Sequence, residues 1–491
     1  MSLAIALAKG DGIGPEIMDA TVELFKAAGV TKHATFHEVE MGASVFAQGN
    51  TRGMTDEAVK ITEECGILFK GPMGTPSGKG GKSINVTARK MWNAFANFRV
   101  FKTLPCVETV YTKAGMNLDF SVVRENIEDT YGGVERRLTN DVVECKRLIS
   151  APGCDQVHRF AFETARKLGV KKVHCGHKAN IMKLTDGLFL ERFHEIGKAY
   201  PEIEKADVIV DALCMNLVMK PRQYQMIVLT NLQGDIVSDL CAGLVGGLGF
   251  APSANIGNHI SIFEAVHGTA PDIQGKGIAN PTSLVLSGLM MLRHLCLYQE
   301  AAHIENALLA ALESGIHTGD FGSKVIPPVG TKAFTQAIID RLGKKPQSIP
   351  SVEVPEAGQH CMIRAPRPTT QQLIRTFTEM KAQVVGCDLY IDTTQPPAKI
   401  ADAMGRLCEG TPFRLTLISN RGTQVWPTGS IYTECVDYLR VRFELKDAAS
   451  PVDQQACLAL LIKVAASFTI ANYELLRTFD GVRGFSMAQG Q

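Results

Sequence analysis

The sequence lacks most of the features that mark secreted, membrane or nucleic-acid-binding proteins. Its 13 Cys form no CxxC pair, which gives no support for a zinc ribbon, and their odd number does not suggest a disulfide framework. Reduced thiols in a reducing compartment are the simpler expectation. No apolar run approaches the length of a membrane span. The formal net charge is +1, so no bulk field would recruit nucleic acid or an anionic membrane, and neither is expected as a partner.

The N-terminus leads directly into an apolar segment, residues 3–8. It lacks the basic start and long apolar core of a signal peptide, and it is not an Arg-rich transit peptide. We therefore expect a cytoplasmic protein, with the mitochondrial matrix as the alternative if a transit peptide has been removed. At 491 residues the chain is too long for one ordinary core, so two or three domains are expected.

A glycine-rich turn, residues 10–16 with the sequence GDGIGPE, follows the first predicted strand and precedes a helical pattern. Strand, glycine-rich turn and helix form the layout of a nucleotide-binding loop. The spacing, however, is not GxGxxG, and no Walker ending follows. Taken alone, this stretch is better interpreted as a structural tight turn, with Pro15 at the helix start.

What the chain does contain is a pair of carboxylates at the start of a predicted helix. The apolar run 225–229 predicts a buried strand before it. Asp235 and Asp239 are four residues apart and therefore share one helix face. They repel each other unless a cation lies between them, and Mg²⁺ and Mn²⁺ prefer carboxylate oxygens. A metal site and a helix N-terminus that attracts acids through its dipole both fit this pair alone.

Arginines and small polar residues gather near a glycine-rich loop at residues 77–82. Ser83, Asn85 and Arg89 follow that loop, and Arg99 and Arg124 lie further along the chain. Because a guanidinium binds carboxylate as a bidentate fork, this set indicates a site for an acid with several carboxylates. Each arginine taken singly is better explained by a surface ion pair.

Further candidate groups follow predicted strands. Tyr131 lies in the polar segment 124–133 and is a candidate proton donor if its pKa is tuned, with an ordinary surface tyrosine as the alternative. Lys178 follows one apolar strand, and Asp211 ends another. A strand at 261–266 runs into the loop 267–277, which could wrap the adenosine of a dinucleotide.

The last third of the chain is predicted to form a separate module. The Pro- and Lys-containing stretch 343–368 is typical of a linker. Beyond it the strand and helix patterns restart and predict a compact α+β domain. Its expected strands lie near 383–391, 413–418 and 436–445, and its expected helices lie near 397–408 and 452–476.

In combination these segments resemble the β-decarboxylating dehydrogenases, which include isocitrate, isopropylmalate, homoisocitrate and tartrate dehydrogenases. The resemblance is carried by residues 10–16, 124–126, 231–239 and 267–272, and their combination is highly specific. Within this isocitrate/isopropylmalate dehydrogenase family, the chain most resembles the isocitrate dehydrogenases with a C-terminal extension, as in Thermus-like bacteria.

The resemblance implies roles for individual residues. Asp235 and Asp239, with Asp211 of the partner subunit, would bind Mg²⁺ or Mn²⁺. Tyr131 would protonate the enol after loss of CO₂, and Lys178 of the partner subunit would help remove the hydroxyl proton. The implied substrate-binding residues are Thr75, Ser83, Asn85, Arg89, Arg99, Arg124 and Asn180. The implied cofactor-binding residues are Thr75, Glu264, His267, Gly268, Thr269, Ala270, Asp272, Ile273 and Asn280.

The fold implied by the resemblance is an α/β open sheet that is not a Rossmann fold, with large and small domains, followed by a C-terminal α+β domain. The large domain would comprise residues 1–98 and 250–342 and include the cofactor loop. The small domain, residues 99–249, would hold the metal site, the clasp and the dimer interface. The linker 343–368 and the C-terminal domain 369–491 would follow. A site shared between subunits makes a homodimer the minimum active unit and leaves higher assembly open.

The cofactor expected from the resemblance is NAD. NADP-dependent relatives usually carry Lys-Tyr after the segment 267–271, where this chain has Asp272 and Ile273. A carboxylate accepts hydrogen bonds from ribose hydroxyls but repels a 2′-phosphate. The alternative is that Asp272 is a turn residue and that Lys324 or Lys332 contacts the phosphate of NADP.

The expected reaction is the oxidative decarboxylation of isocitrate to 2-oxoglutarate and CO₂ with reduction of NAD. One alternative is a sister enzyme acting on homoisocitrate, isopropylmalate or tartrate, against which Ser83 and Asn85 argue, because this pattern resembles the isocitrate branch. The other alternative is a regulatory, non-catalytic subunit. The presence of the acids, of Tyr131 and of Lys178 argues against it.

Overall fold

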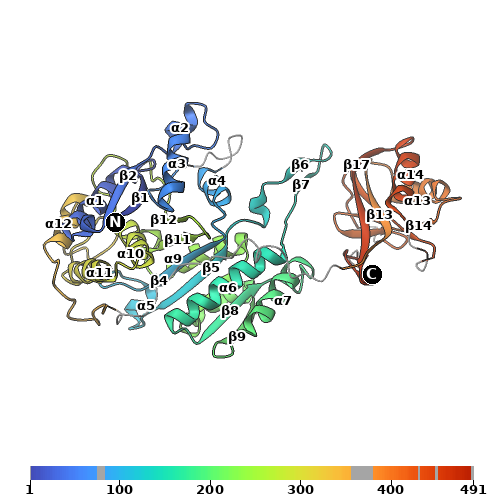
Figure 1. The fold of residues 1–491 in the computed structure, drawn as a ribbon. Helices are drawn as coiled ribbons and strands as arrows, with labels where there is room; N and C mark the ends of the chain where they lie inside the picture. Colours follow the sequence, from blue (N-terminus) through green and yellow to red (C-terminus); the bar gives the residue numbers. More distant parts are fainter. Residues whose placement is uncertain are drawn as a thin grey trace. The chain divides into compact units, whose positions relative to one another are not determined.

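The computed structural model of the chain describes residues 2–74, 83–354, 380–429, 432–447, 450 and 452–487. It divides into two compact units. Unit 1 comprises Met1–Gly132 and Arg147–Thr369, and unit 2 comprises Gly133–Lys146 and Thr370–Gln491. Each unit has its own buried apolar core, so each is described by itself. The ribbon of the whole chain is drawn in Figure 1.

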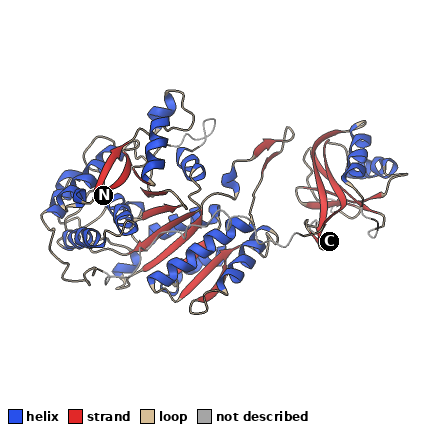
Figure 2. Ribbon diagram, viewed as in Figure 1, coloured by secondary structure: helices blue, strands red, loops and turns tan. Residues whose placement is uncertain are grey.

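Unit 1 is built on a ten-stranded mixed sheet in the order β2-β1-β3-β12-β11-β4-β5-β10-β8-β9. Central strands β11 and β4 run antiparallel to both of their neighbours, and the flanking strands pair in parallel on either side. The predicted α/β open sheet is therefore confirmed (Figure 2). The strands are β1 (Leu3–Ala8), β2 (Ala34–Glu38), β3 (Ile67–Lys70), β4 (Ala96–Lys102), β5 (Asp119–Glu125), β8 (Lys172–His177), β9 (Glu204–Ile209), β10 (Met226–Leu229), β11 (Pro252–Ile256) and β12 (Ser261–Ala265).

Helices pack on the sheet of unit 1, and Figure 1 shows α6 and α7 side by side over the β5–β10–β8–β9 part. Helix α6 illustrates why the sequence forms them. The Ser150 hydroxyl accepts the Gly153 N–H at its start, and Gly169 ends it at φ 69°. The helices are α1 (Gly14–Ala27), α2 (Ala43–Ala47), α3 (Asp56–Cys65), α4 (Ile84–Met91), α5 (Val110–Lys113), α6 (Ala151–Leu168), α7 (Thr185–Gly197), α8 (Val210–Met219), α9 (Asn231–Leu244), α10 (Thr282–His294), α11 (Tyr298–Glu313) and α12 (Thr331–Ile339).

Helix α10 lies in the core of unit 1 and is apolar almost all round. Met290 and Met291 are buried and fill space in this core. Gly288 faces Phe25, and a Cβ at this glycine would lie 2.4 Å from the phenyl ring. Burial of a phenylalanine side chain such as that of Phe25 stabilises the fold by roughly 1.5–3 kcal/mol.

Unit 2 contains a six-stranded antiparallel sheet in the order β15-β14-β16-β13-β17-β18. Helices α13 and α14 pack on one face, against alternate residues of β13 such as Leu389 and Ile391. The α+β prediction is confirmed. The elements are β13 (Ala382–Asp392), α13 (Pro397–Leu407), β14 (Phe413–Asn420), β15 (Thr423–Trp426), β16 (Tyr438–Leu445), α14 (Gln454–Ala465), β17 (Thr469–Phe479) and β18 (Val482–Arg483).

One predicted element of unit 2 is wrong. The helix expected over 452–476 ends at Ala465, and Thr469–Phe479 forms β17. This strand pairs with β13 along almost its whole length. The backbone hydrogen bonds of that pairing, which involve residues about 80 positions upstream, outweigh the local helical pattern.

A small hairpin, β6 (Glu135–Arg137) and β7 (Val143–Cys145), also belongs to unit 2. An isolated two-stranded hairpin is marginally stable in water. Here the Thr139 hydroxyl donates to Asp437 at 2.5 Å, and Asn472 donates to Glu144 at 3.3 Å. These contacts hold the hairpin on the C-terminal part of the same unit.

The division of residues 1–342 into large and small domains stays a prediction.

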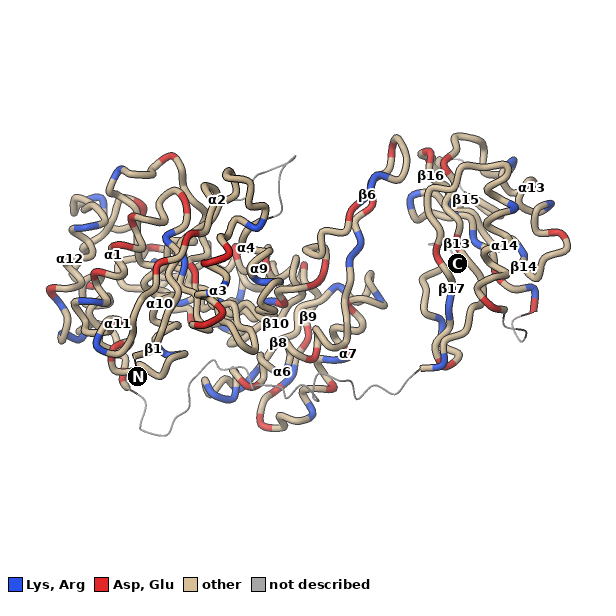
Figure 3. Tube along the Cα trace, turned by 45° about the horizontal axis from the view of Figure 1, so that its top comes forward, with Lys and Arg blue, Asp and Glu red and all other residues tan. Residues whose placement is uncertain are grey.

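Charges and thiols are distributed without a dominant block. Acidic and basic positions are interspersed in both units in Figure 3, in line with the net charge of +1. Eleven cysteines of the described residues carry a reduced thiol, whereas Cys296 is disulfide-bonded, which the expectation of reduced thiols did not include. In the described part of the chain, the helices are all too short or too polar to cross a membrane. The predicted linker 343–368 lies outside the described residues from position 355 onward.

A buried ion pair in unit 2 provides a test of its stability. Arg442 donates to Asp388 through two hydrogen bonds of 2.8 Å, and the side chains are 1% and 4% exposed. Asp388→Asn leaves the buried guanidinium without a counter-ion, so we expect the free energy of unfolding of unit 2 to fall by about 3–5 kcal/mol. Calorimetry of the whole chain should show the unfolding transition of unit 2 at a lower temperature. Asp402→Asn on the exposed side of α13 is the control, and equal shifts in both variants would contradict the expectation.

Candidate active site

Three arginines that the sequence singled out meet inside unit 1. Arg89 comes from α4, Arg99 from β4 and Arg124 from the end of β5. Arg99 is 4% exposed and Arg124 is 1% exposed. Burial and the charges of the other two guanidiniums lower the pKa of Arg99 to about 10. So much buried positive charge in one place favours the binding of an anion with several carboxylates.

The predicted acid pair lies beside these arginines. Helix α9 begins at Asn231, so Asp235 and Asp239 share one face as expected. Arg124 donates to Asp235, and Arg99 lies 3.4 Å from Asp239 and 3.9 Å from Asp235. Burial raises the pKa of Asp239. For Asp235 the effect of burial is outweighed by the three arginine charges together with the Tyr131 hydrogen bond, so its pKa is lowered. The two carboxylates therefore differ in ionisation behaviour although they are neighbours.

Tyr131 reaches the same acid from a separate loop. Its hydroxyl donates to Asp235 Oδ2 at 2.6 Å, and the Arg124 guanidinium lies 4.9 Å from its ring centre. Lys90 donates to the Tyr131 carbonyl oxygen at 2.6 Å and fixes its backbone. Burial and the hydrogen bond to Asp235 raise the pKa of Tyr131 above its ordinary value. The hydroxyl is thus held protonated beside the acid pair and is not an ordinary surface tyrosine.

Ser83 and Asn85 lie at the start of α4. The Ser83 side chain accepts the Val86 N–H and begins the helix. The Asn85 carbonyl oxygen accepts a hydrogen bond of 2.8 Å from Lys70. Thr75, the remaining residue predicted for this region, lies outside the described residues.

Lys70 is a buried charge that the sequence interpretation missed. It ends strand β3, is 1% exposed, and pairs with Glu264, which also accepts from Arg89 at 2.8 Å. Burial lowers the pKa of Lys70, while Lys70 and Arg89 together hold the pKa of Glu264 well below its usual range. Glu264 thus orients Arg89, and its predicted contact with the cofactor stays a prediction. A lysine ending the apolar run 66–69 was the available signal.

The loop predicted to bind the cofactor is fixed to the glycine-rich turn near the N-terminus. The Ile13 N–H donates to the Thr269 oxygen at 2.9 Å, and a Cβ at Gly12 would lie 2.0 Å from that oxygen. The Glu16 carboxylate accepts the N–H groups of Gly277 and Ala279 at 3.1 and 2.9 Å. This agrees with the interpretation of residues 10–16 as a structural turn, whose glycine allows the two loops to approach closely.

Residues within that loop differ in their surroundings. His267 follows strand β12, and its Nε2 atom is buried without a hydrogen-bond partner in the described part of the chain. Ile273 packs against the core of unit 1, whereas Asp272 is exposed in a turn. Ala270 has a φ of 41°, and Gly268 lies on the exposed rim.

Asn280 ends the loop and has a structural environment. Its amide donates to Asp320 at 3.0 Å, and its oxygen accepts the Thr282 N–H at the start of α10. Its polar atoms thus already have partners within the chain.

Lys178, Asn180 and Asp211 form a second group. The Lys178 ammonium donates to Asp211, whose side chain is 67% exposed, and Asn180 is exposed beside them. Among the described residues no hydrogen bond or ion pair joins this group to Asp235, and no cluster of three or more metal-ligating side chains is present. The fold of one chain therefore brings the predicted site residues together in two groups.

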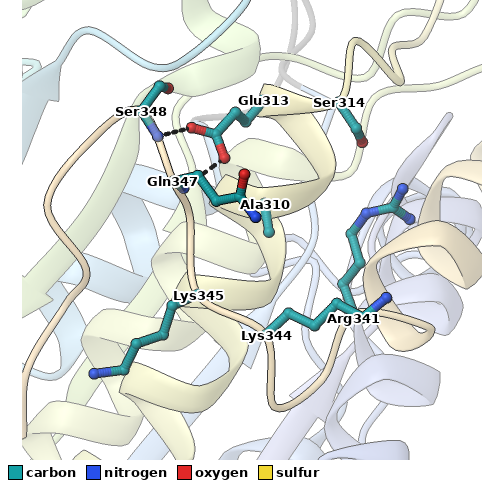
Figure 4. A pocket seen from close by; sticks show the side chains of 8 residues that line it. All are labelled: Ala310, Glu313, Ser314, Arg341, Lys344, Lys345, Gln347 and Ser348. Atoms are coloured by element: carbon teal, nitrogen blue, oxygen red, sulfur yellow. Dashed lines mark hydrogen bonds between the residues drawn. The ribbon is translucent and has the colours of Figure 1, made fainter.

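A cavity of about 770 Å³ lies elsewhere in unit 1, at the ends of α11 and α12. Figure 4 shows Glu313 turned toward the backbone of Gln347 and Ser348, whose N–H groups donate to its carboxylate. This contact holds the segment after α12 against the end of α11. The residues that line the cavity do not include the predicted site residues.

Comparison with known proteins extends over the whole chain. It is 43% identical over 494 residues to the isocitrate dehydrogenase [NADP] of Thermus thermophilus, covering 99% of this chain and 96% of the relative. It is 38% identical to the isocitrate dehydrogenase [NADP] of Rickettsia conorii, covering 99% of both chains. A crystal structure of a protein from Thermus thermophilus matches with a TM-score of 0.92 at 42% identity, covering 99% of this chain and 96% of the other.

These relatives overturn the expectation of NAD. The full-length relatives are NADP enzymes, although the expectation rested on the repulsion between Asp272 and a 2′-phosphate. The structure supplies the physical reason for the error. Asp272 is exposed in a turn, where solvent screens its charge, so one carboxylate there is weak evidence against a phosphate.

Family models account for both parts of the chain. The isocitrate/isopropylmalate dehydrogenase model matches residues 4–340, and the bacterial isocitrate dehydrogenase C-terminal domain matches residues 382–491. The expected subtype with a C-terminal extension is thereby confirmed. The chain belongs to the isocitrate/isopropylmalate dehydrogenase family, in the form that carries the bacterial isocitrate dehydrogenase C-terminal domain.

Proposed function

We propose that this protein catalyses the oxidative decarboxylation of isocitrate to 2-oxoglutarate and CO₂ with reduction of NADP. The observation that carries the proposal is the convergence of Arg99 and Arg124 on Asp235, with Arg89 near both guanidiniums and the Tyr131 hydroxyl at the same carboxylate. Isocitrate has three carboxylates, which match this concentration of guanidiniums. Full-length relatives that bear the name isocitrate dehydrogenase [NADP] support both the substrate and the cofactor. The cytoplasm as the compartment stays a prediction.

Substrate choice within the family is proposed to depend on Ser83 and Asn85. Ser83 caps α4, and Asn85 lies in its first turn, one turn before Arg89. Hydrogen-bonding groups there suit the γ-carboxylate arm of isocitrate better than the apolar arm of isopropylmalate. Lys70 positions the Asn85 amide by donating to its oxygen at 2.8 Å, which directs the Asn85 N–H₂ group away from the lysine.

The carboxylates fit a divalent cation. Asp235 and Asp239 present hard oxygen donors on one helix face, and Asp211 of the partner subunit would complete the set for Mg²⁺ or Mn²⁺. When bound, the ion would polarise the hydroxyl and carbonyl oxygens of the substrate and stabilise the charge that develops on decarboxylation. Arg124 and Tyr131 orient the Asp235 carboxylate through hydrogen bonds.

Proton transfer falls to two residues of this chain. Tyr131 retains its hydroxyl proton at neutral pH and can donate it to the carbon that loses CO₂. Lys178 of the partner subunit would take part in removing the hydroxyl proton of isocitrate before hydride transfer. Its ammonium is held by Asp211, so the two residues of the second group would enter the site together.

A homodimer is proposed as the active unit, because an apolar face lies beside the acids. Helices α8 and α9 pack side by side, with Asp211 on one and Asp235 on the other. Met215, Met219 and Ile236 on these helices are 55%, 65% and 61% exposed. Apolar side chains gathered in this way are typical of a protein interface. A second copy on this face would bring its α8 to the α9 of the first.

The loop 267–277, proposed here to bind NADP, carries positive charge that the expectation of NAD did not take into account. The Gly277 oxygen accepts the Thr331 N–H at 2.9 Å, which joins the loop to the start of α12. Lys276 and Lys332 are the chain neighbours of this contact, and both are exposed. They supply the charge for a 2′-phosphate. The orphaned Nε2 atom of His267 is a polar group that the bound nucleotide would pair.

The cofactor assignment is tested by comparing kcat/KM for NADP and NAD at saturating isocitrate and Mg²⁺. We expect a clear preference for NADP. Lys332→Ala should lower kcat/KM for NADP by about tenfold, because a charged hydrogen bond to phosphate contributes about 1.5–3 kcal/mol. It should leave kcat/KM for NAD unchanged. Lys344→Ala, on another exposed loop of unit 1, is the matched control. A preference for NAD in the native enzyme would sink the assignment.

The metal site is tested by chelation and by Asp235→Asn. EDTA should stop turnover, and added Mg²⁺ or Mn²⁺ should restore it. Asp235→Asn removes a metal-binding charge while keeping the side-chain shape, so we expect kcat to fall by about 10³-fold or more. Asp340→Asn, at the exposed end of α12, should be active. Full turnover by Asp235→Asn in Mg²⁺ would exclude this carboxylate as a ligand.

Tyr131→Phe removes only the hydroxyl. We expect kcat to fall by about 10²- to 10⁴-fold with little change in the KM for isocitrate, because the lost group acts as a general acid and not in binding. Tyr200→Phe, whose buried hydroxyl donates to Glu163 away from the site, is the control and should keep its activity. Native turnover in Tyr131→Phe would assign the proton donor elsewhere.

A further inference from the structure

Arg147 joins two fully buried carboxylates of unit 1. Its side chain is 17% exposed, whereas Asp129 and Asp186 are 0% exposed. The Nε of Arg147 donates to Asp129 at 2.6 Å, and its Nη1 donates to Asp186. Burial disfavours the charged guanidinium, but both carboxylates together raise the pKa of Arg147. The charges depend on one another, since an unpaired buried charge is costly.

Asp129 connects this ion pair to the Tyr131 loop and to the metal-binding helix. Its Oδ1 accepts the Thr130 N–H at 2.8 Å, immediately before Tyr131. Its Oδ2 accepts the N–H of Leu232, in the first turn of α9, at 3.0 Å. Asp129 has a φ of 66°, so its conformation is one that needs support from its neighbours. The carboxylate thereby fixes the proton donor relative to the helix that carries Asp235.

Asp186 connects the same guanidinium to the second group of site residues. Its Oδ2 accepts the backbone N–H of Lys178 at 2.6 Å and the side-chain amide of Gln233, on α9, at 2.9 Å. Arg147 Nη1 also donates to Thr185, beside Asp186, at 3.0 Å. The segment that presents Lys178 is therefore fixed by the charge that fixes the Tyr131 loop.

We propose that Arg147, with Asp129 and Asp186, positions both groups of site residues within one chain. This inference rests on the proposed function, in which Tyr131 serves the site of its own chain and Lys178 serves the site of the partner. One guanidinium then controls the geometry of two different active sites. A cation with one point of contact could not do the same, because the planar fork of arginine reaches both carboxylates at once.

The proposal separates positioning from substrate binding. Arg147 contacts none of the arginines predicted to bind isocitrate. Loosening its network misplaces the proton donor and the lysine, and small displacements of reacting groups cost up to about 100-fold in rate. We therefore expect Arg147→Lys to lower kcat by about tenfold or more, while the KM for isocitrate changes by less than about threefold.

The matched control is Arg192→Lys. Arg192 also holds a partly buried carboxylate, Asp155, by two hydrogen bonds of 2.6 and 2.9 Å, but it touches neither site group. Its variant should keep native kcat. If Arg147→Lys does not fold, the double variant Arg147→Met with Asp186→Asn replaces it. That variant removes one positive and one negative charge and so keeps the net charge of the buried group unchanged.

Heterodimers separate the inference from the function on which it rests. They are made by co-expression of two differently tagged chains and purified over both tags. A Tyr131→Phe chain paired with a Lys178→Met chain has one intact site if sites are shared, so about half of native turnover is expected. No activity in this heterodimer would refute the shared site and leave the ion-pair network to act within one site.

The deciding heterodimer pairs an Arg147→Lys chain with a native chain. The variant chain contributes Tyr131 to one site and Lys178 to the other, and both residues are less well positioned in it. Both sites should therefore be impaired. Turnover should then fall well below half of native and approach that of the variant homodimer. Turnover at half of native would show that Arg147 affects one site only, and native kcat in the Arg147→Lys homodimer would refute any positioning role.

Discussion

The Asp235 carboxylate, held between the Arg124 guanidinium and the Tyr131 hydroxyl, is the interaction on which the site depends. Arg124 is 1% exposed and cannot remain charged there without an anion beside it. The sheet supplies the geometry, because β5 ends in Arg124 and its neighbour β10 leads into α9. The site has one positive charge in excess, because four basic side chains face three acidic ones: Lys70, Arg89, Arg99 and Arg124 against Asp235, Asp239 and Glu264. An anionic substrate and a divalent cation are complementary to this arrangement.

The site residues lie in two separate groups within one chain, so the proposed function requires a second copy of the chain. Lys178 and Asp211 pair with each other and, among the described residues, stay apart from Asp235 within one chain. The helices that carry the acids expose apolar side chains, among them Met219 and Ile236. In the proposed dimer the Arg147 network therefore positions Tyr131 for one site and Lys178 for the other. A buried charge network suits this role because its members lose their partners together.

The cofactor shows how a local electrostatic argument fails. The exposed Asp272 suggested repulsion of a 2′-phosphate, yet the full-length relatives are NADP enzymes. The charge at such a site is a sum over segments that are distant in sequence. The segments that carry Lys276 and Lys332 lie together because the Thr331 N–H donates a hydrogen bond to the Gly277 oxygen. A single short sequence motif gives no information about these contacts.

The sequence by itself determined the family, the open α/β sheet, the acid pair on one helix face and the C-terminal α+β domain. Periodicity and specific motifs carry this information locally. Only the tertiary structure showed that Glu264 pairs with Lys70 and Arg89, that 469–479 is a strand, and that Arg147 joins Asp129 to Asp186. These contacts join residues up to about 200 positions apart. Burial decides them, because a charge removed from water must find its partner wherever the fold places one.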